Sequence, residues 1–188
     1  MKTYLLPAIK MTIVCLFLCV GMYTLLIWGI GQLLGPNNGQ AELMESDGKV
    51  VGAANLGQLF SSDGYFHGRP SAVDYNAAGS GGSNKAPSNP DYLDLLRERL
   101  DAYSSLNGTM AGTPVTSDAI TASGSGLDPH LSKYAALLQA PRISRARNID
   151  ERLVRDLVEA HTQEALWRLF GPKDYVNVLK LNIALDDL

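Results

Sequence analysis

The chain has 188 residues, of which 46% are hydrophobic, and its formal net charge is −3. All 19 acidic residues lie beyond position 41, where they outnumber 14 basic residues, so this part of the chain carries a charge of −5. That excess of acid argues against nucleic acid, and against anionic lipid, as the main partner.

The N-terminal segment is the first element that the sequence predicts. No charged residue occurs in residues 11–35, which read MTIVCLFLCVGMYTLLIWGIGQLLG. A helix of about 20 apolar residues crosses the hydrocarbon core of a bilayer, so we expect one transmembrane helix here. A cleaved signal peptide is the alternative, but its apolar region is only about 7–15 residues long and ends at a small-x-small site.

The charges that flank this segment predict its orientation. Lys2 and Lys10 precede it, whereas Glu42 comes before Lys49 on the other side. The flank rich in Lys and Arg usually stays in the cytoplasm. The predicted organisation is a cytoplasmic N-terminus (1–10), a transmembrane helix (11–35) and an extracytoplasmic α+β head domain (36–188), which is long enough for one hydrophobic core.

The first half of the head alternates between short predicted elements and turns. A strand is expected at about 49–53, followed by an aromatic, turn-rich stretch at 65–72. Residues 76–90, NAAGSGGSNKAPSNP, have the composition of a linker, although an ordered functional loop stays open. A helix is expected at about 91–104, because Asn89 can cap it and Pro90 suits its first turn.

The second half predicts two helices and a strand. Asp128-Pro129 resembles a helix start, with the helix running to about 139. A longer helix is expected at about 149–170, ended by Gly171-Pro172. Residues 175–185 alternate between apolar and polar side chains, which predicts a strand. These elements together indicate an α+β fold.

Residues with catalytic or metal-binding chemistry are sparse. The three histidines, His67, His130 and His161, form no cluster with metal-ligand spacing, so no metal site and no catalytic residue are expected. Ser125 does not stand in a G-x-S-x-G turn, and Lys85 lacks the preceding glycine of a phosphate loop. The residues by themselves therefore favour an anchored accessory or binding protein.

A run of arginines stands out in the otherwise acidic head. Two interpretations stay open for it, a solvated surface and a docking patch for carboxylates. The run comprises Arg142, Arg145, Arg147, Arg152 and Arg155.

Four blocks of sequence together resemble one known family across nearly the whole chain. They are residues 50–58, VVGAANLGQ; 65–90, YFHGRPSAVDYNAAGSGGSNKAPSNP; 120–149, ITASGSGLDPHLSKYAALLQAPRISRARNI; and 176–186, VNVLKLNIALD. With the single N-terminal apolar segment, the chain is similar to the C subunit of the Kdp potassium-transporting ATPase. One departure is Ala53-Ala54-Asn55, where the family more often has Ser and a larger apolar residue.

This resemblance implies a place in a bacterial inner-membrane complex that imports potassium ions. The implied partners are a channel-like subunit, a P-type ATPase subunit, a small single-span subunit and the lipid bilayer, with no nucleic acid. The complex uses ATP and Mg²⁺, while no cofactor is expected on this chain itself. Assembly, and capping of the outer ion entrance, is the favoured role; the alternative is a catalytic chaperone that raises the ATP affinity of the ATPase subunit.

The matched blocks also supply candidate residues for subunit contacts or for critical turns of the fold. Because residues 79–90 lie in a matched block, the resemblance favours an ordered loop there. The candidates are Gln58, Phe66, Arg69, Pro70, Ser83, Asn84, Pro87, Ser123, Asp128, Pro129, His130, Arg147 and Asn177.

Overall fold

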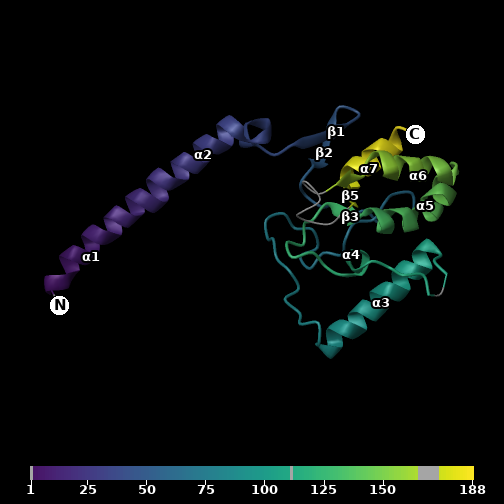
Figure 1. The fold of residues 1–188 in the computed structure, drawn as a ribbon, viewed down its shortest axis with the longest axis horizontal. Helices are drawn as coiled ribbons and strands as arrows, with labels where there is room; N and C mark the ends of the chain where they lie inside the picture. The colour runs from purple at the N-terminus through teal and green to yellow at the C-terminus, as the bar shows by residue number, and fades with distance from the viewer. Residues whose placement is uncertain (1, 111, 165–173) are drawn as a thin grey trace. The chain divides into compact units, whose positions relative to one another are not determined.

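A computed structural model describes residues 2–110, 112–164 and 174–188 (Figure 1). The chain divides into two units, residues 1–42 and residues 43–188. Each is described by itself.

The first unit is one continuous helical segment. It consists of α1 (Lys2–Cys15), the π-helical η1 (Leu16–Met22) and α2 (Tyr23–Leu34). Its apolar part, Tyr4–Leu34, covers 31 residues with a mean hydropathy of 2.4, and none of its most apolar stretch is buried. The helix is therefore long and apolar enough to cross a membrane, and it starts before the predicted boundary at residue 11.

A short turn, η2 (Pro36–Gly39), follows that helix, and the second unit begins with an antiparallel hairpin. The hairpin pairs β1 (Leu43–Ser46) with β2 (Lys49–Ala53), which confirms the strand predicted at 49–53. Asp47 and Gly48 join the strands, both with positive φ, as an Asp-Gly hairpin turn requires.

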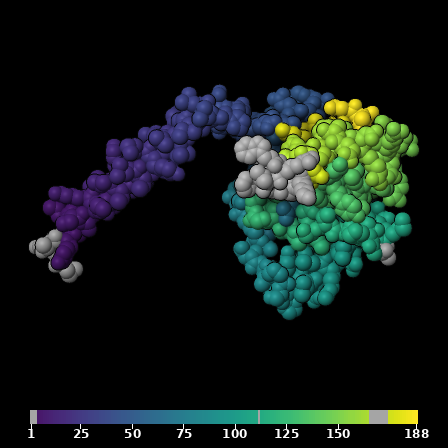
Figure 2. Space-filling view, in the orientation of Figure 1, coloured from purple at the N-terminus to yellow at the C-terminus, as the bar shows by residue number. Residues whose placement is uncertain are grey.

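Helix α3 (Pro90–Asn107) confirms the helix predicted at 91–104. The Asn89 side chain accepts a hydrogen bond from the Tyr92 backbone N–H at 3.2 Å, which is the expected cap. Gly108, with φ of 63°, ends the helix in the left-handed conformation. In the space-filling view, this helix forms one edge of the second unit (Figure 2).

The helix predicted to start at Asp128 begins later, so that prediction is wrong at both ends. Residues 130–132 form strand β3 (His130–Ser132), and α5 (Lys133–Arg147) is capped by Ser132, which accepts from the Ala135 N–H at 3.3 Å. The Asp128 carboxylate instead accepts from the His130 N–H at 3.0 Å. The helix continues past Pro141, where the sequence predicted its end.

The helix predicted at 149–170 is shorter in the structure. Helix α6 (Glu151–Ala160) is capped by Asp150 and ends before His161, and β4 (Gln163–Glu164) follows. The remainder of the prediction, residues 165–170, lies outside the described residues.

The strand predicted at 175–185 is correct only for its first residues. Strand β5 (Asp174–Asn177) gives way to helix α7 (Val178–Asp186), because Asn177 accepts from the Lys180 N–H at 3.1 Å and caps the helix. The polar residue Asn182, which the alternation placed on the solvent side, is buried.

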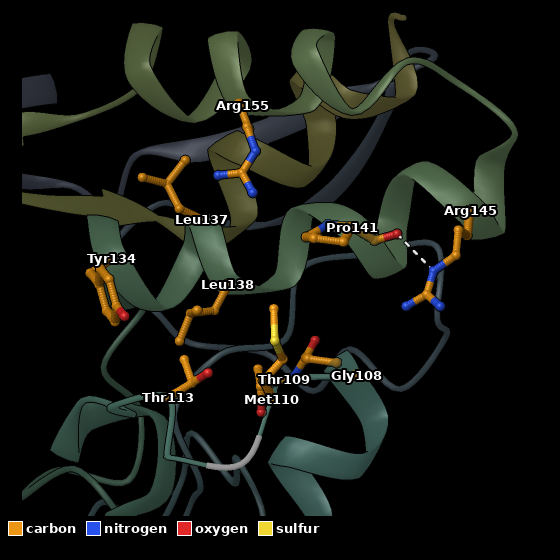
Figure 3. A pocket seen from close by; sticks show the side chains of 11 residues that line it. Gly108, Thr109, Met110, Thr113, Tyr134, Leu137, Leu138, Pro141, Arg145 and Arg155 are labelled. Carbon is orange, nitrogen blue, oxygen red and sulfur yellow. Dashed lines mark hydrogen bonds between the residues drawn. The ribbon is translucent and has the colours of Figure 1, made fainter.

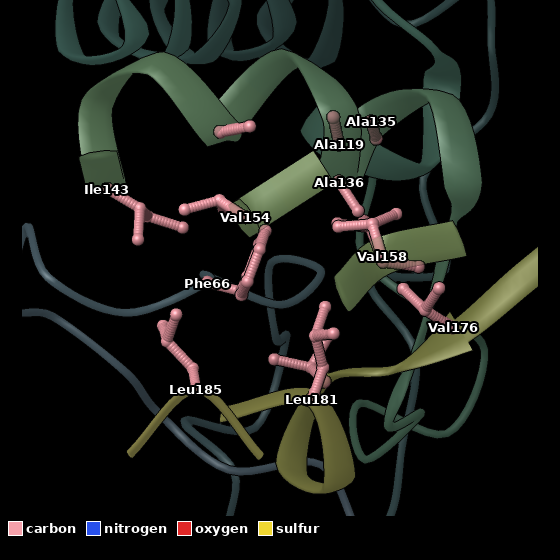
Figure 4. Packing of buried hydrophobic residues seen from close by; sticks show 13 residues of the cluster. Phe66, Ala119, Ala135, Ala136, Ile143, Val154, Val158, Val176, Leu181 and Leu185 are labelled. Carbon is pink, nitrogen blue, oxygen red and sulfur yellow. The ribbon is translucent and has the colours of Figure 1, made fainter. Parts of the chain in front are cut away.

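These elements build an α+β unit, as the sequence predicted. Strand β5 lies between β3 and β4 in an antiparallel sheet, and the one-turn helix α4 (Ser117–Ile120) contacts β3. Phe66, from an irregular segment, lies inside the apolar core among side chains of α5, α6 and α7 (Figure 4). The core residues from these helices include Ala136, Ile143, Val154, Val158, Leu181 and Leu185.

Candidate functional site

Two segments, residues 57–82 and 121–130, pack against each other and contain most of the candidate residues; both are irregular up to the start of β3 at His130. We call them the loop platform. They join directly where the Gly57 N–H donates to the Leu127 carbonyl at 2.7 Å and the Gly81 N–H donates to the Ser125 carbonyl at 2.9 Å. The platform has almost no regular secondary structure, so side chains from the helices must hold its backbone in place.

Arg142 of α5 is the centre of that support. It is 4% exposed, and its guanidinium donates to four acceptors: the backbone carbonyls of Asp63 and Tyr65, and the side chains of Asn107 and Gln139. Burial lowers the pKa of Arg142, although the nearby charge of Asp63 opposes this. A planar group with five N–H donors is suited to such a role, which an ammonium group cannot fill.

Two buried amide side chains hold the next residues of the platform. Asn182 of α7 accepts from the Phe66 N–H at 2.8 Å and donates to the Phe66 carbonyl at 3.0 Å. Gln139 of α5 makes the same pair of bonds with His67, at 2.8 and 3.0 Å. Each amide thus bonds to the N–H and the C=O of one residue, as the backbone of a neighbouring strand would. Burial also lowers the pKa of the His67 imidazole.

Arg147 holds the outer side of the same segment. Its guanidinium donates to the Gly64 carbonyl and to the Asp186 carboxylate, both at 2.6 Å, and lies 4.6 Å from the centre of the Tyr65 ring. The Tyr65 hydroxyl reaches the same carboxylate at 3.1 Å. The arginine run therefore splits: Arg142 and Arg147 support the platform, whereas Arg145, Arg152 and Arg155 are exposed.

Asp128 ties the two segments of the platform together. Its carboxylate pairs with Arg69 at 3.0 Å and with His130 Nδ1 at 3.1 Å, and the His130 ring meets the edge of Tyr175 at 5.0 Å between centres. Burial alone would raise the pKa of Asp128, but the hydrogen bonds from His130 and Arg69 outweigh it and hold the pKa below its usual value.

Asp128→Asn is expected to change how stability depends on pH. A carboxyl with a lowered folded-state pKa adds stability above its unfolded pKa of about 4, and that stability is lost as pH falls through the folded value. The variant should be less stable than the parent at pH 7, and the difference should shrink below about pH 4. Urea midpoints at both pH values measure this, with Asp94→Asn, an exposed pair with Arg97, as the control.

Gly126 makes the close packing of the two segments possible. Its φ is +70°, and an added Cβ would lie 2.5 Å from Val73 Cγ2 and 2.9 Å from the Gly81 carbonyl oxygen. Two residues earlier, a Cβ on Gly124 would meet nothing within 4 Å.

Gly126→Ala is therefore expected to destabilise the second unit by about 2 kcal/mol, through overpacking and a left-handed φ. The matched variant Gly124→Ala should change stability by less than about 0.5 kcal/mol. Equal urea midpoints for the two variants would contradict the tight packing at this point.

Ser71 and Tyr75 shape the remaining part of the platform. The Ser71 hydroxyl donates to the Gly126 carbonyl at 2.7 Å and accepts from the Tyr75 N–H at 3.0 Å. The Tyr75 hydroxyl donates to the Arg69 carbonyl. Pro70 lines a shallow hollow of about 340 Å³ beside these residues.

Other candidate residues anchor the platform to its neighbours. Gln58 donates to the Val51 carbonyl of β2 at 3.1 Å, and the Asn177 side chain donates to the Ala54 carbonyl at 2.6 Å. The Pro129 carbonyl accepts from the Val178 N–H at 2.9 Å. The buried Ser123 hydroxyl accepts from the Asp128 N–H at 3.5 Å, a structural role.

The structure does not bring Ser83, Asn84 and Pro87 into this arrangement. All three are exposed, beyond the point where residues 80 and 81 bond to Ser125. The resemblance favoured an ordered loop over residues 79–90; the bonds of the loop to Asn76 and Ser125 involve residues 79–81.

The candidate residues did not include Gln139, Arg142, Asn182 and Asp186, although they support the platform. One signal was available, because Asn182 interrupts the apolar stretch LNIAL of α7. Many polar groups of the platform are used in hydrogen bonds that position the backbone, although Arg69 Nε is buried without a partner. In the described residues, no three His, Cys, Asp or Glu side chains are grouped to hold a metal ion. Such an arrangement presents a fixed surface, which is suited to binding.

Comparison with known proteins gives one consistent family. Residues 5–187 match the family model described as KdpC, the K⁺-transporting ATPase c chain. A potassium-transporting ATPase KdpC subunit of Flavobacterium johnsoniae is 47% identical over 184 residues, which cover 98% of each chain. Subunits of the same name from Bacteroides thetaiotaomicron and Mycobacterium tuberculosis are 43% and 45% identical; the alignments cover 100% of this chain and 99% and 100% of theirs.

Proposed function

The chain belongs to the KdpC family, the c chains of K⁺-transporting ATPases, and on this premise we propose that it is a non-catalytic accessory subunit of an ATP-driven potassium import complex. Its role is to stabilise the assembly of the channel-like subunit, the ATPase subunit and the small single-span subunit in the bacterial inner membrane. The head lies on the extracytoplasmic side and caps the outer ion entrance.

The observation that carries this proposal is the way the loop platform is built. Arg142, Gln139 and Asn182 use their polar atoms to hold backbone groups of residues 63–67 in place. Reactive groups need free polar atoms that point at a substrate, whereas a docking surface needs a backbone that does not move on binding. A preorganised surface in a chain that also carries an apolar helix supports an assembly role.

Copurification tests membership of the complex. The tagged chain is expressed from its native operon context, extracted in mild detergent and analysed by mass spectrometry. We expect a P-type ATPase and a large channel-like protein in constant ratio, and neither with an unrelated tagged single-span protein. Recovery of the chain alone, under conditions that keep other membrane complexes intact, would refute the proposal.

Cysteine labelling tests the side of the membrane on which the head lies. The only native cysteines, Cys15 and Cys19, lie in the apolar helix and can be replaced by Ala. We then expect Asp94→Cys, an exposed position on α3, to react with an impermeant maleimide in intact spheroplasts. Labelling only after permeabilisation would mean that the head lies in the cytoplasm, where ATP is present, and would favour the catalytic-chaperone alternative.

Charge neutralisation tests the capping role. Helix α3 carries exposed carboxylates, and an acidic surface over the entrance would raise the local cation concentration. The triple variant Asp91→Asn, Glu98→Gln and Asp101→Asn is expected to raise the apparent KM for potassium transport about twofold at low ionic strength. The effect should vanish at high salt, and transport with an unchanged KM at low salt would count against capping by this face.

A further inference from the structure

A pocket outside the loop platform lies between α5 and the segment that follows α3. Its volume is about 470 Å³, which is within the range of about 300–1,000 Å³ typical of small-molecule sites. Figure 3 shows it from close by, with Tyr134 and Arg145 at opposite ends and Leu138 and Pro141 between them.

The wall of this pocket is mostly apolar. Helix α5 contributes Tyr134, Leu137, Leu138 and Pro141, and the opposite side includes Met110, whose side chain is 85% exposed. Such an open apolar trough leaves apolar surface exposed, which costs free energy in water. An apolar chain bound in the trough would remove that cost.

The charged groups on the pocket are both guanidinium groups. Arg145 donates to the Pro141 carbonyl at 3.1 Å, and the ion pairs of the described residues include no carboxylate partner for it. Arg155 is paired with Glu151 at 2.7 Å, so its charge is partly compensated. No acidic residue lines the pocket in the described part of the chain, and its rim therefore carries a net positive charge.

One polar atom of the wall supports the same interpretation. The Thr109 hydroxyl is buried and has no hydrogen-bond partner among the described residues. A buried hydroxyl without a partner costs about 1–3 kcal/mol, and an acceptor placed in the pocket could remove that cost after a small shift of the side chain.

From these three features we propose that the pocket binds a single-chain amphiphilic anion, an alkyl chain with a carboxylate head. The chain lies along Leu138 toward Tyr134, and the carboxylate lies against Arg145, with Arg155 adding positive charge to the pocket wall. Guanidinium groups bind carboxylates through paired, charge-assisted hydrogen bonds, which gives the site its preference for an anion over a neutral chain.

Methyl NMR of the full chain in lipid nanodiscs tests this proposal with sodium octanoate as the probe. The methionines carry ¹³C-labelled methyl groups. Met110 reports on the pocket, Met44 of β1 reports on the rest of the second unit, and Met11 and Met22 report on partitioning into lipid. We expect a saturable shift of Met110 with octanoate, no shift of Met44, and binding of 1-octanol about tenfold weaker.

Variants separate the charge effect from loss of fold. Arg145→Gln should weaken octanoate binding about tenfold and leave octanol binding unchanged, and Arg155→Gln should act in the same direction. Arg152→Gln is the matched control, because its side chain is 86% exposed on the same helix as Arg155 and does not line the pocket.

Three results would overturn the proposal. They are no saturable shift of Met110, equal affinity for octanoate and octanol, and octanoate binding that Arg145→Gln and Arg155→Gln leave unchanged. The measurement depends on neither transport nor assembly, so its failure would leave the proposed function untouched.

Discussion

Arg142→Met is expected to lower the free energy of unfolding of the second unit by about 3 kcal/mol. Four acceptors lose their donor, and a buried acceptor without a partner costs about 1–3 kcal/mol. Two effects reduce this loss of stability. The desolvation cost of the buried guanidinium disappears with the side chain, and Gln139 still accepts its bond from the His67 N–H. The loss of the acceptors' partners still dominates, because at least the Tyr65 carbonyl and Asn107 side chain are left without this donor.

Urea-dependent pulse proteolysis of the full chain in mild detergent measures this change. Arg142→Lys should also destabilise the unit, because one ammonium group cannot reach four acceptors in a plane. Arg152→Met is the control, with an expected change below about 0.5 kcal/mol, since its pair with Asp156 is exposed and 3.9 Å long. A parent-like midpoint for Arg142→Met would mean that the platform does not depend on this side chain.

Phe66→Ala is expected to cost about 3–5 kcal/mol, the typical loss for truncating a fully buried aromatic side chain. Phe66 is 0% exposed and packs against the cluster formed by α5, α6 and α7. The substitution keeps the backbone bonds to Asn182, so the loss comes from the cavity and the lost apolar burial. Phe66→Leu, which fills most of the cavity, should cost less than about 1.5 kcal/mol.

The same variants decide between the two roles that the resemblance left open for Phe66. The control is Phe60→Ala, a half-buried ring 5.8 Å from Tyr65, for which we expect about 1 kcal/mol. If Phe66 is critical for the fold, Phe66→Ala lowers the urea midpoint and copurification together. A normal midpoint with lost copurification would instead make Phe66 a subunit contact.

Elements with all their determinants close together in the chain could be predicted from sequence. Helix α3 has its cap at Asn89, its first-turn proline and its terminal Gly108 within one short segment, and it formed where expected. Strand β2 also formed as expected. The helix expected at 128–139 failed because two caps competed: Asp128 is bound by His130 and by Arg69, 59 positions away, which left Ser132 to cap α5.

The residues of the site divide in the same way. The candidates from the resemblance included Arg69, Asp128 and Arg147, and the structure places each in the contacts of the loop platform. They did not include Gln139 or Asn182, because a buried amide that binds backbone is indistinguishable in a sequence from an exposed one. Ser83 and Pro87 show the converse, since a matched block also contains residues that are exposed.

The sequence by itself determined that this chain has one apolar helix able to cross a membrane, an acidic α+β unit after it, and the family to which it belongs. Only the tertiary structure decided that residues 178–186 form a helix and that Arg142 is buried rather than part of a docking patch. The physical reason is distance along the chain. Apolar length, charge and caps act between neighbours, whereas the bonds from Gln139 to His67 and from Asn182 to Phe66 join residues 72 and 116 positions apart.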